Sequence, residues 1–272
     1  MPLIDGKLIA QELKQGIKNE VENMRLKPVL AIIIVGDDQE SQRYVRMKQR
    51  AIEEIGGLCQ THCLNQANTD KLIDLVEELN DNPDVHGILV QLPLPSGLDT
   101  DRILSSICTT KDVDGFSPLN LGLIFTGQQY FTSCAALGVM HVVDKYAAIP
   151  SPRVLLVGDS FDVIKPLANL FIGRGCSVTI TPALQPWIDM QLFDVVVIEN
   201  GEPASIEASC FAASALVIDA GFHWIDEKTC GNVRTADFVG EGSPWLLPVP
   251  GGLGPLLITM LMWNLVKAGK LN

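Results

Sequence analysis

With 272 residues, of which 47% are hydrophobic and 19% charged, the chain is long enough to bury the core of one or two globular domains. Its formal net charge of −12 opposes binding to nucleic acid or to an anionic membrane. The sequence has neither an apolar run as long as a bilayer span nor a signal-peptide pattern, so we expect a cytoplasmic protein.

The seven cysteines are scattered along the chain, which fits free thiols in a reducing cytosol. Cys59, His62 and Cys63 stand close together and raise the question of a metal site. The stretch around them alternates as a strand does, and no second ligand pair follows at zinc spacing. We therefore expect buried or edge thiols here, and no metal.

The first hundred residues alternate between helical and strand patterns. Apolar residues recur at helical spacing from Ile9 to Met24, and Pro28 ends this stretch. The continuous apolar run over 29–35 predicts a parallel strand that is buried on both faces. The next expected elements are a helix over about 41–55 closed by two glycines, a strand over 58–64, a helix with Thr69 as its N-cap, and a strand over 85–92.

A second α/β series follows a loop and a short apolar stretch over 119–125. A helix over about 135–146 leads into strands expected at 153–157, 177–181, 193–198 and 216–219, and an apolar helix over about 256–266 comes last. This alternation predicts two α/β lobes with mainly parallel sheets and a cleft between them. We expect residues 1–134 plus 253–272 to form one lobe, and 135–252 to form a Rossmann-like dinucleotide-binding lobe.

Tyr44 and Lys48 are four residues apart and share one face of the predicted helix. A lysine shielded from water by a cleft and an aromatic ring can serve as a general acid or base near neutral pH. The alternative is a surface lysine on a polar helix face, which the neighbouring Arg43, Arg46 and Arg50 favour.

Three other places carry polar or flexible groups beside predicted strands and helices. Gln91 ends a buried strand, where its amide can present a donor and an acceptor to a cleft or simply face water. Asp112 and Asp114 lie in a turn; they can form that turn, or one of them can bind a cationic or amidine-like group. Gly251 and Gly252 allow the backbone to approach a flat ligand closely, or they make a tight turn into the last helix.

Four motifs follow one another along the chain: Tyr44-Val-Arg-Met-Lys48, Gly87-Ile-Leu-Val-Gln-Leu-Pro-Leu-Pro95, Lys111-Asp-Val-Asp-Gly-Phe116 and Pro248-Val-Pro-Gly-Gly-Leu-Gly-Pro255. Taken together, they resemble the motifs of one family, the bifunctional FolD-type methylenetetrahydrofolate dehydrogenase/cyclohydrolases. The resemblance spans almost the whole chain. It implies oxidation of 5,10-methylenetetrahydrofolate with NADP, then hydrolysis to 10-formyltetrahydrofolate, by a homodimer paired through the second lobe.

The resemblance also implies roles for single residues. Lys48 would be the catalytic acid/base for water attack and ring opening. Gln91 would hold Lys48 and polarise the reacting centre, and Tyr44 would pack on the pterin and help orient the lysine. Asp114 would accept hydrogen bonds from the amidine-like edge of the pterin. The remaining implied contacts are with the pterin and nicotinamide through Pro250, Gly251 and Gly252, and with NADP through Gly158, Asp159, Ser160 and Phe222.

The chain departs from the family pattern in the second lobe. In the loop over 158–166, Asp159 and Asp162 place negative charge where the NADP phosphates are expected, and Ile164 stands where a glycine is usual. Pro182 and Ala183 replace the polar pair that usually reaches the 2′-phosphate. We therefore expect weakened NADP binding. Use of NAD, a cyclohydrolase without dehydrogenase activity and a folate-binding pseudoenzyme remain alternatives.

Overall fold

A computed structural model of the chain describes residues 3–147, 149–225 and 227–271. The chain divides into two compact units, each with its own parallel sheet. The three-stranded unit joins Gln11–Cys134 with the segment from Ile258 onward, and the five-stranded unit joins the segment up to Ala10 with Ala135–Leu257.

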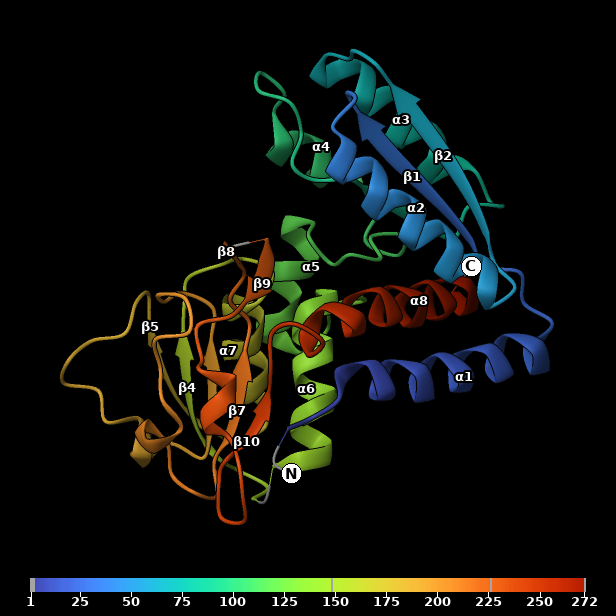
Figure 1. The fold of residues 1–272 in the computed structure, drawn as a ribbon. Coiled ribbons are helices and arrows are strands. Elements are labelled where there is room, and N and C mark those ends of the chain that lie inside the picture. The colour runs from blue at the N-terminus through green and yellow to red at the C-terminus, as the bar shows by residue number, and fades with distance from the viewer. Residues whose placement is uncertain (1–2, 148, 226, 272) are drawn as a thin grey trace. The chain divides into compact units, whose positions relative to one another are not determined.

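The sheet of the three-stranded unit has the order β2-β1-β3, and both strand pairs are parallel. Its strands are β1 (Val29–Val35), β2 (Leu58–Leu64) and β3 (Gly87–Val90). Figure 1 shows β1 beside β2. All residues of β1 and β3 are buried, which explains their unbroken apolar runs. Helix α2 (Gln39–Glu54) packs on β1 and β2, and α3 (Thr69–Asp81) packs on β3.

The other helices that contribute to this unit are mostly short. They are α4 (Thr100–Ser106), α5 (Pro118–Leu123) and the 3-10 turn η1 (Ile124–Thr126), with parts of the long helices α1 (Gly6–Met24) and α8 (Leu253–Leu271). Although α8 is rich in apolar residues, none of the helices in the described part of the chain is long and apolar enough to cross a membrane.

Several boundaries expected from the sequence were wrong, among them the start of the strand expected over 193–198, which begins at Val195, and the bounds of α2. The N-cap of α3 is Asn68, whose side chain accepts a hydrogen bond from the backbone nitrogen of Lys71 at 2.8 Å, and Thr69 is already helical. Strand β3 is shorter than the apolar run over 85–92 at both ends, and Pro93, which has no N–H, cannot continue the ladder beyond its carboxyl end. Helix α8 is longer than expected at both ends, because its first and last turns carry fewer of the apolar residues that marked its centre.

The sheet of the five-stranded unit has the order β10-β7-β6-β4-β5, and all its pairs are parallel (Figure 1). Its strands are β4 (Arg153–Val157), β5 (Ser177–Thr181), β6 (Val195–Ile198), β7 (Leu216–Asp219) and β10 (Trp245–Leu247). Helix α7 (Ile164–Gly173) packs on β4 and β5. The remaining elements are α6 (Cys134–Tyr146), the antiparallel pair β8 (His223–Ile225) and β9 (Lys228–Cys230), and the 3-10 turns η2 (Met190–Leu192), η3 (Ala208–Cys210) and η4 (Thr235–Asp237).

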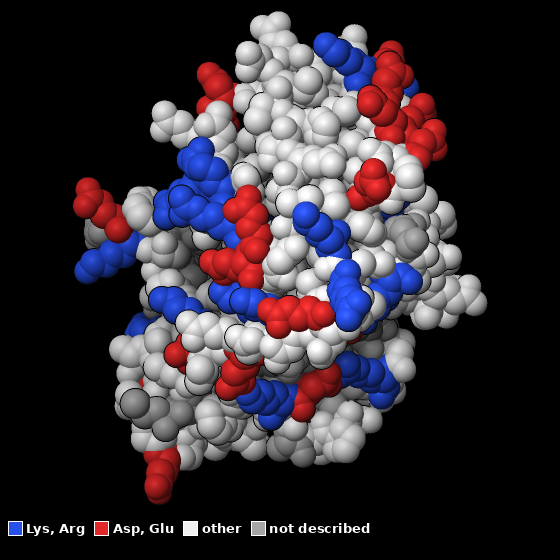
Figure 2. Space-filling model, turned by 90° about the vertical axis from the view of Figure 1, so that its right-hand side faces the viewer, with Lys and Arg blue, Asp and Glu red and all other residues white. Residues whose placement is uncertain are grey.

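Basic and acidic side chains intermingle on the face drawn in Figure 2. Several of the exposed charges are paired within one unit, as in the contact between Lys14 and Glu54 at 2.6 Å. Such exposed pairs contribute at most about 1 kcal/mol each. These exposed pairs therefore add little to the stability of either unit.

Candidate active site

Lys48 and Gln91, predicted as neighbours, are in contact in the three-stranded unit. The Lys48 Nζ donates a hydrogen bond to the Gln91 Oε1 at 3.1 Å. The Gln91 Nε2 donates to the carbonyl of Leu92 at 2.7 Å, so the amide oxygen is the atom left to face the lysine. The backbone nitrogen of Gln91 donates to the carbonyl of Ile33, which continues the β1–β3 ladder and fixes the residue at the strand end.

Helix α2 positions Lys48 and Tyr44 one turn apart. Asp38 caps this helix by accepting a hydrogen bond from the backbone nitrogen of Ser41 at 2.7 Å, and hydrogen bonds to Ser41 lower the pKa of this carboxyl. Val45 is buried on the inner face, whereas Lys48 is half-buried and Tyr44 is 42% exposed. The exposed ring leaves a flat surface available beside the lysine.

Lys111, the first residue of the predicted Lys-Asp-Val-Asp-Gly turn, is buried and closes the end of α3. Its Nζ donates hydrogen bonds to the carbonyls of Leu79, Asn80 and Asn82, at 3.1, 2.7 and 2.7 Å. Burial lowers the pKa of this amine, and the nearby Cys108 and Asp81 oppose that shift. Lys111 therefore stabilises the fold of the turn and α3.

Asp112 is also buried and holds the turn together. Its carboxylate accepts hydrogen bonds from the backbone nitrogens of Phe116 and Ser117 and from the Asn120 side-chain amide, at 3.1, 2.9 and 2.9 Å. Of the two carboxylates in the motif, Asp112 is the turn former. Asp114 is the half-buried one that remains as a candidate for a ligand.

Asp114 lies beside a buried thiol. The Cys134 Sγ is 3.7 Å from the Asp114 Oδ1. Burial raises the pKa of the Cys134 thiol well above its usual value, the Asp114 charge raises it further, and the Lys48 charge lowers it. Because both charges act on the same sulfur, Lys48, Asp114 and Cys134 belong to one neighbourhood of this unit.

Two features fix the backbone around Asp114. Gly115 has φ +69°, and a Cβ placed on it would lie 2.7 Å from the backbone carbon of Thr132. The buried Asn264 of α8 donates from its Nδ2 to the carbonyls of Val113 and Thr132, at 2.8 and 3.1 Å. Sequence reasoning missed Asn264 and Cys134; a polar residue inside the apolar run over 256–266 was the available signal for Asn264.

Pro250, Gly251 and Gly252 lie in the five-stranded unit, before α8. Gly251 has φ +91°, and a Cβ on Gly252 would lie 2.2 Å from the carbonyl oxygen of Pro248. A Cβ on Gly6 would in turn meet the carbonyl oxygen of Gly252 at 2.0 Å. Tight packing therefore accounts for these glycines, and their contact with substrate stays a prediction.

The loop that follows β4 contains three of the predicted nucleotide-binding residues. Gly158 is buried with φ +146°, Asp159 is exposed, and Ser160 is half-buried. The Ser160 Oγ accepts hydrogen bonds from the backbone nitrogens of Val163 and Ile164, at 3.2 and 3.1 Å. The first turn of α7 is thus capped by a side chain of its own loop.

A residue that sequence reasoning missed, Glu199, reaches the same loop. Its Oε2 accepts a hydrogen bond from the backbone nitrogen of Ser160 at 3.3 Å. A pyrophosphate needs free N–H donors and little negative charge. With these donors engaged, and with the carboxylates of Asp159 and Glu199 present, the loop does not fit a pyrophosphate in this conformation.

Phe222, also predicted to contact the nucleotide, is 65% exposed just after β7. Asp219 ends β7 and accepts hydrogen bonds from the backbone nitrogens of Gly221, Asn232 and Val233, at 3.0, 3.1 and 2.8 Å. Burial raises the pKa of Asp219 despite these bonds. The buried carboxylate fixes the backbone that carries Phe222.

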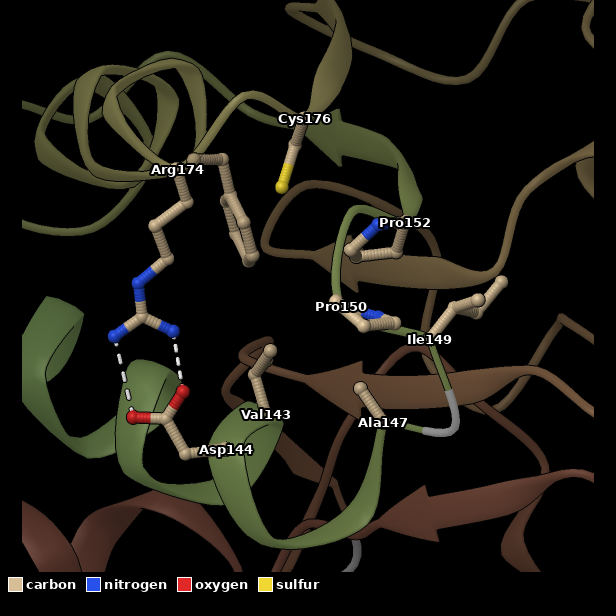
Figure 3. Close-up of a pocket in the computed structure, with 9 residues that line it drawn as sticks. Val143, Asp144, Ala147, Ile149, Pro150, Pro152, Arg174 and Cys176 are labelled. Atoms are coloured by element: carbon tan, nitrogen blue, oxygen red, sulfur yellow. Dashed lines mark hydrogen bonds and ion pairs between the residues drawn. The ribbon is translucent and has the colours of Figure 1, made fainter.

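A small cavity of about 210 Å³ lies in the five-stranded unit, between the end of α6 and the end of α7 (Figure 3). Arg174 pairs there with Asp144 through its two terminal guanidinium nitrogens. Cys176 precedes β5, so this cavity lies at the amino edge of the sheet, whereas the 158–160 loop lies at the carboxyl edge. None of the predicted site residues lines it.

All seven cysteines lie within the described residues and are free thiols. Burial, with a contribution from Glu53, raises the pKa of Cys59 to about 12, so this thiol stays protonated at neutral pH. Among the residues that the structure describes, no group of three or more His, Cys, Asp or Glu side chains is placed to hold a metal ion.

These two units define a two-domain α/β protein, with polar side chains at the carboxyl edges of both parallel sheets. Residues 4–114 match the family model "Tetrahydrofolate dehydrogenase/cyclohydrolase, catalytic domain", and residues 133–272 match its NAD(P)-binding domain. The chain belongs to the tetrahydrofolate dehydrogenase/cyclohydrolase family, the bifunctional FolD-type enzymes of one-carbon folate metabolism. The resemblance and the fold class predicted from the sequence are thereby confirmed.

Relatives of this chain match over almost their full length. It is 40% identical to Bifunctional protein FolD 1 of Syntrophomonas wolfei, over 99% of both chains. A FolD crystal structure from Campylobacter jejuni is 33% identical and covers 98% of both chains with a TM-score of 0.90. A Trypanosoma brucei FolD structure, complexed with NADP cofactor and inhibitor, is 28% identical with a TM-score of 0.87, covering 98% of this chain and 97% of that one.

Proposed function

We propose that this chain hydrolyses 5,10-methenyltetrahydrofolate to 10-formyltetrahydrofolate, with Lys48 as the acid/base. The observation that carries the proposal is the 3.1 Å hydrogen bond from the Lys48 Nζ to the Gln91 Oε1. It holds a half-buried amine at the carboxyl edge of a parallel sheet, where ligands of open α/β sheets bind.

The reaction requires a proton to be taken from the attacking water and a proton to be delivered to the departing nitrogen. Water adds to the carbon of the methenyl cation, and the bond from this carbon to one ring nitrogen then breaks. One proton of the water ends on the released nitrogen, and the other leaves to solvent. The Lys48 amine takes a proton from the attacking water and returns it to the departing nitrogen. Gln91 keeps the amine oriented, since its amide oxygen accepts from nitrogen in either protonation state.

Asp114 and Tyr44 supply the recognition of the pterin in this proposal. The Asp114 carboxylate accepts hydrogen bonds from the amidine-like N–H edge, a charge-assisted contact. The exposed ring of Tyr44 packs on the flat face of the pterin, one helical turn from Lys48. The position of Asp114 beside Cys134, whose thiol senses both the Asp114 and the Lys48 charge, supports this assignment.

The second candidate activity is oxidation of 5,10-methylenetetrahydrofolate with NADP. The match of residues 133–272 to the NAD(P)-binding domain of the family favours it. Use of NAD is a variant of this candidate, because Pro182 and Ala183 offer no charged partner to a 2′-phosphate. The bonded loop of Ser160 and Glu199 instead favours a cyclohydrolase that binds no nucleotide.

A cytoplasmic homodimer paired through the five-stranded unit is the accompanying expectation for the assembly, and it rests on the family resemblance alone. Sedimentation of the purified chain tests it, since a dimer has twice the 29.5 kDa mass of the monomer. A sedimenting mass equal to that of the monomer would refute the dimer.

The experiment for the hydrolase follows the loss of the methenyl chromophore with wild-type protein, Lys48→Met and Arg46→Met. Arg46 is an exposed cation on the same helix and serves as the matched control. We expect Lys48→Met to slow hydrolysis by about 10²- to 10⁴-fold and Arg46→Met to leave it unchanged. Absence of hydrolysis by the wild-type protein, with folate binding retained, would favour the folate-binding pseudoenzyme instead.

A further inference from the structure

The parallel register of the five-stranded sheet brings Glu199 beside the phosphate loop. Val157 of β4 pairs with Ile198 of β6, so the residues that follow them, Gly158 and Glu199, are neighbours at the carboxyl edge. The backbone nitrogen of Glu199 donates to the carbonyl of Val157 at 2.8 Å, which extends the pairing by one residue. The main chain therefore fixes where the Glu199 side chain begins.

The carboxylate of Glu199 occupies the space that Gly158 leaves open. A Cβ placed on Gly158 would lie 2.4 Å from the Glu199 Oε2. A glycine at the end of the first strand of a dinucleotide domain gives a phosphate access to the backbone, and the following N–H groups bind it. Here the same oxygen of Glu199 lies over that glycine and accepts from the backbone nitrogen of Ser160.

We infer that the Glu199 carboxylate is an internal anion that fills the phosphate-binding loop and weakens binding of nucleotides that carry a pyrophosphate. The backbone nitrogens of Val163 and Ile164 at the start of α7 cannot offset this charge by binding a phosphate, because both already donate to the Ser160 hydroxyl. Asp159, held by the Asn200 amide at 3.4 Å, adds a second carboxylate to the same loop. An incoming pyrophosphate must displace Glu199 and then remain next to its charge.

The inference deepens the second candidate activity and rests on nucleotide binding by this domain, whereas the Lys48 proposal does not depend on it. The test measures the affinity of the full chain for NADP and NAD by calorimetry, in wild type, Glu199→Gln, Glu199→Ala and Glu202→Gln. Glutamine keeps an acceptor for Ser160 but removes the charge, and alanine also clears the space. Glu202 is an exposed carboxylate three residues along the same segment, so its variant controls for net charge.

We expect Glu199→Gln to bind both nucleotides at least about tenfold more tightly than wild type, and Glu199→Ala at least as tightly as Glu199→Gln. Glu202→Gln is expected to match wild type. Both nucleotides share the pyrophosphate, so the gain should be similar for NADP and NAD, and added salt should reduce it. Unchanged or weaker binding by Glu199→Gln, or no binding by any of the four proteins, overturns the inference. Hydrolysis measured on the same preparations reports separately on Lys48 and on correct folding.

Discussion

The amide of Gln91 turns its oxygen toward the amine of Lys48 because its nitrogen is bound to the carbonyl of Leu92. A carboxylate at this position would favour the charged ammonium form of the lysine. We therefore expect Gln91→Glu to move the pH profile of hydrolysis to higher pH by about one unit or more. The measurement is the rate of hydrolysis as a function of pH, from about pH 6 to about pH 10. Gln49→Glu adds the same charge elsewhere on α2, and an equal shift in that control would refute the explanation.

Gly115 is required by its backbone conformation and by its contact with Thr132. Gly115→Ala should lower the free energy of unfolding by about 3 kcal/mol or more, since it combines a positive φ with a backbone collision. Gly127 has a nearly equal φ of +67° but nothing within 4 Å of its Cβ position, so Gly127→Ala should cost only about 1 kcal/mol. Urea unfolding compares the two variants. Equal losses of unfolding free energy in the two variants would show that the close packing of Gly115 against Thr132 contributes nothing to stability.

Lys111 is expected to matter for stability and not for proton transfer. Lys111→Met leaves three carbonyls at the end of α3 without their donor, which should cost about 2 kcal/mol. Lys71→Met removes an exposed lysine from the same helix and should change stability by less than about 0.5 kcal/mol. The free energy of unfolding from urea titration is the measurement. A large loss of hydrolysis at full stability in Lys111→Met would instead give this lysine a role in catalysis.

Titration of His86 should lower the stability of the folded chain on mild acidification. Its Nδ1 accepts a hydrogen bond from the backbone nitrogen of Val29 at 3.0 Å, so the folded chain favours the neutral ring. Burial lowers the pKa of His86 below its ordinary value of 6.5, the Lys111 charge lowers it further, and Asp84 opposes both. The unfolded chain therefore binds the proton more tightly. The stabilisation is complete above pH 6.5 and is lost as the pH falls below this value toward the folded pKa.

His86→Asn removes this titration and keeps an acceptor for Val29, because an asparagine oxygen can take the place of the Nδ1. The urea midpoint of the wild type should decrease as the pH is lowered from about 7 to about 5, and that of the variant should decrease less. Parallel curves for the two proteins would show that His86 does not carry the pH dependence.

Local patterns in the sequence predicted most of the fold. The run over 29–35 identified β1 because a strand buried on both faces needs apolar residues throughout. The ends of helices and strands were harder to predict. At the start of α3, for example, Asn68 and Thr69 are both able to cap a helix, and only the backbone conformation decides which one does. The contact of Lys48 with Gln91 was implied by the family resemblance and not by local patterns, and the structure contains it.

Glu199 was beyond the reach of sequence patterns. A charged residue after an apolar strand ordinarily faces water, and nothing local shows that β6 pairs with β4. Asn264 was missed for a related reason, since its two carbonyl partners lie 132 and 151 residues away along the chain. Contacts of this kind depend on strand order and helix packing, which a single sequence does not specify.

In the proposed mechanism, Lys48 is the acid/base of hydrolysis and Gln91 positions its amine. Single-turnover hydrolysis of 5,10-methenyltetrahydrofolate by Lys48→Met, Gln91→Met and the double variant tests this mechanism most directly. If Gln91 acts by holding the lysine, the double variant should be about as slow as Lys48→Met alone. If the factors lost in the two single variants multiply in the double variant, or if Lys48→Met hydrolyses the substrate at nearly the wild-type rate, the proposed roles of Lys48 and Gln91 are wrong.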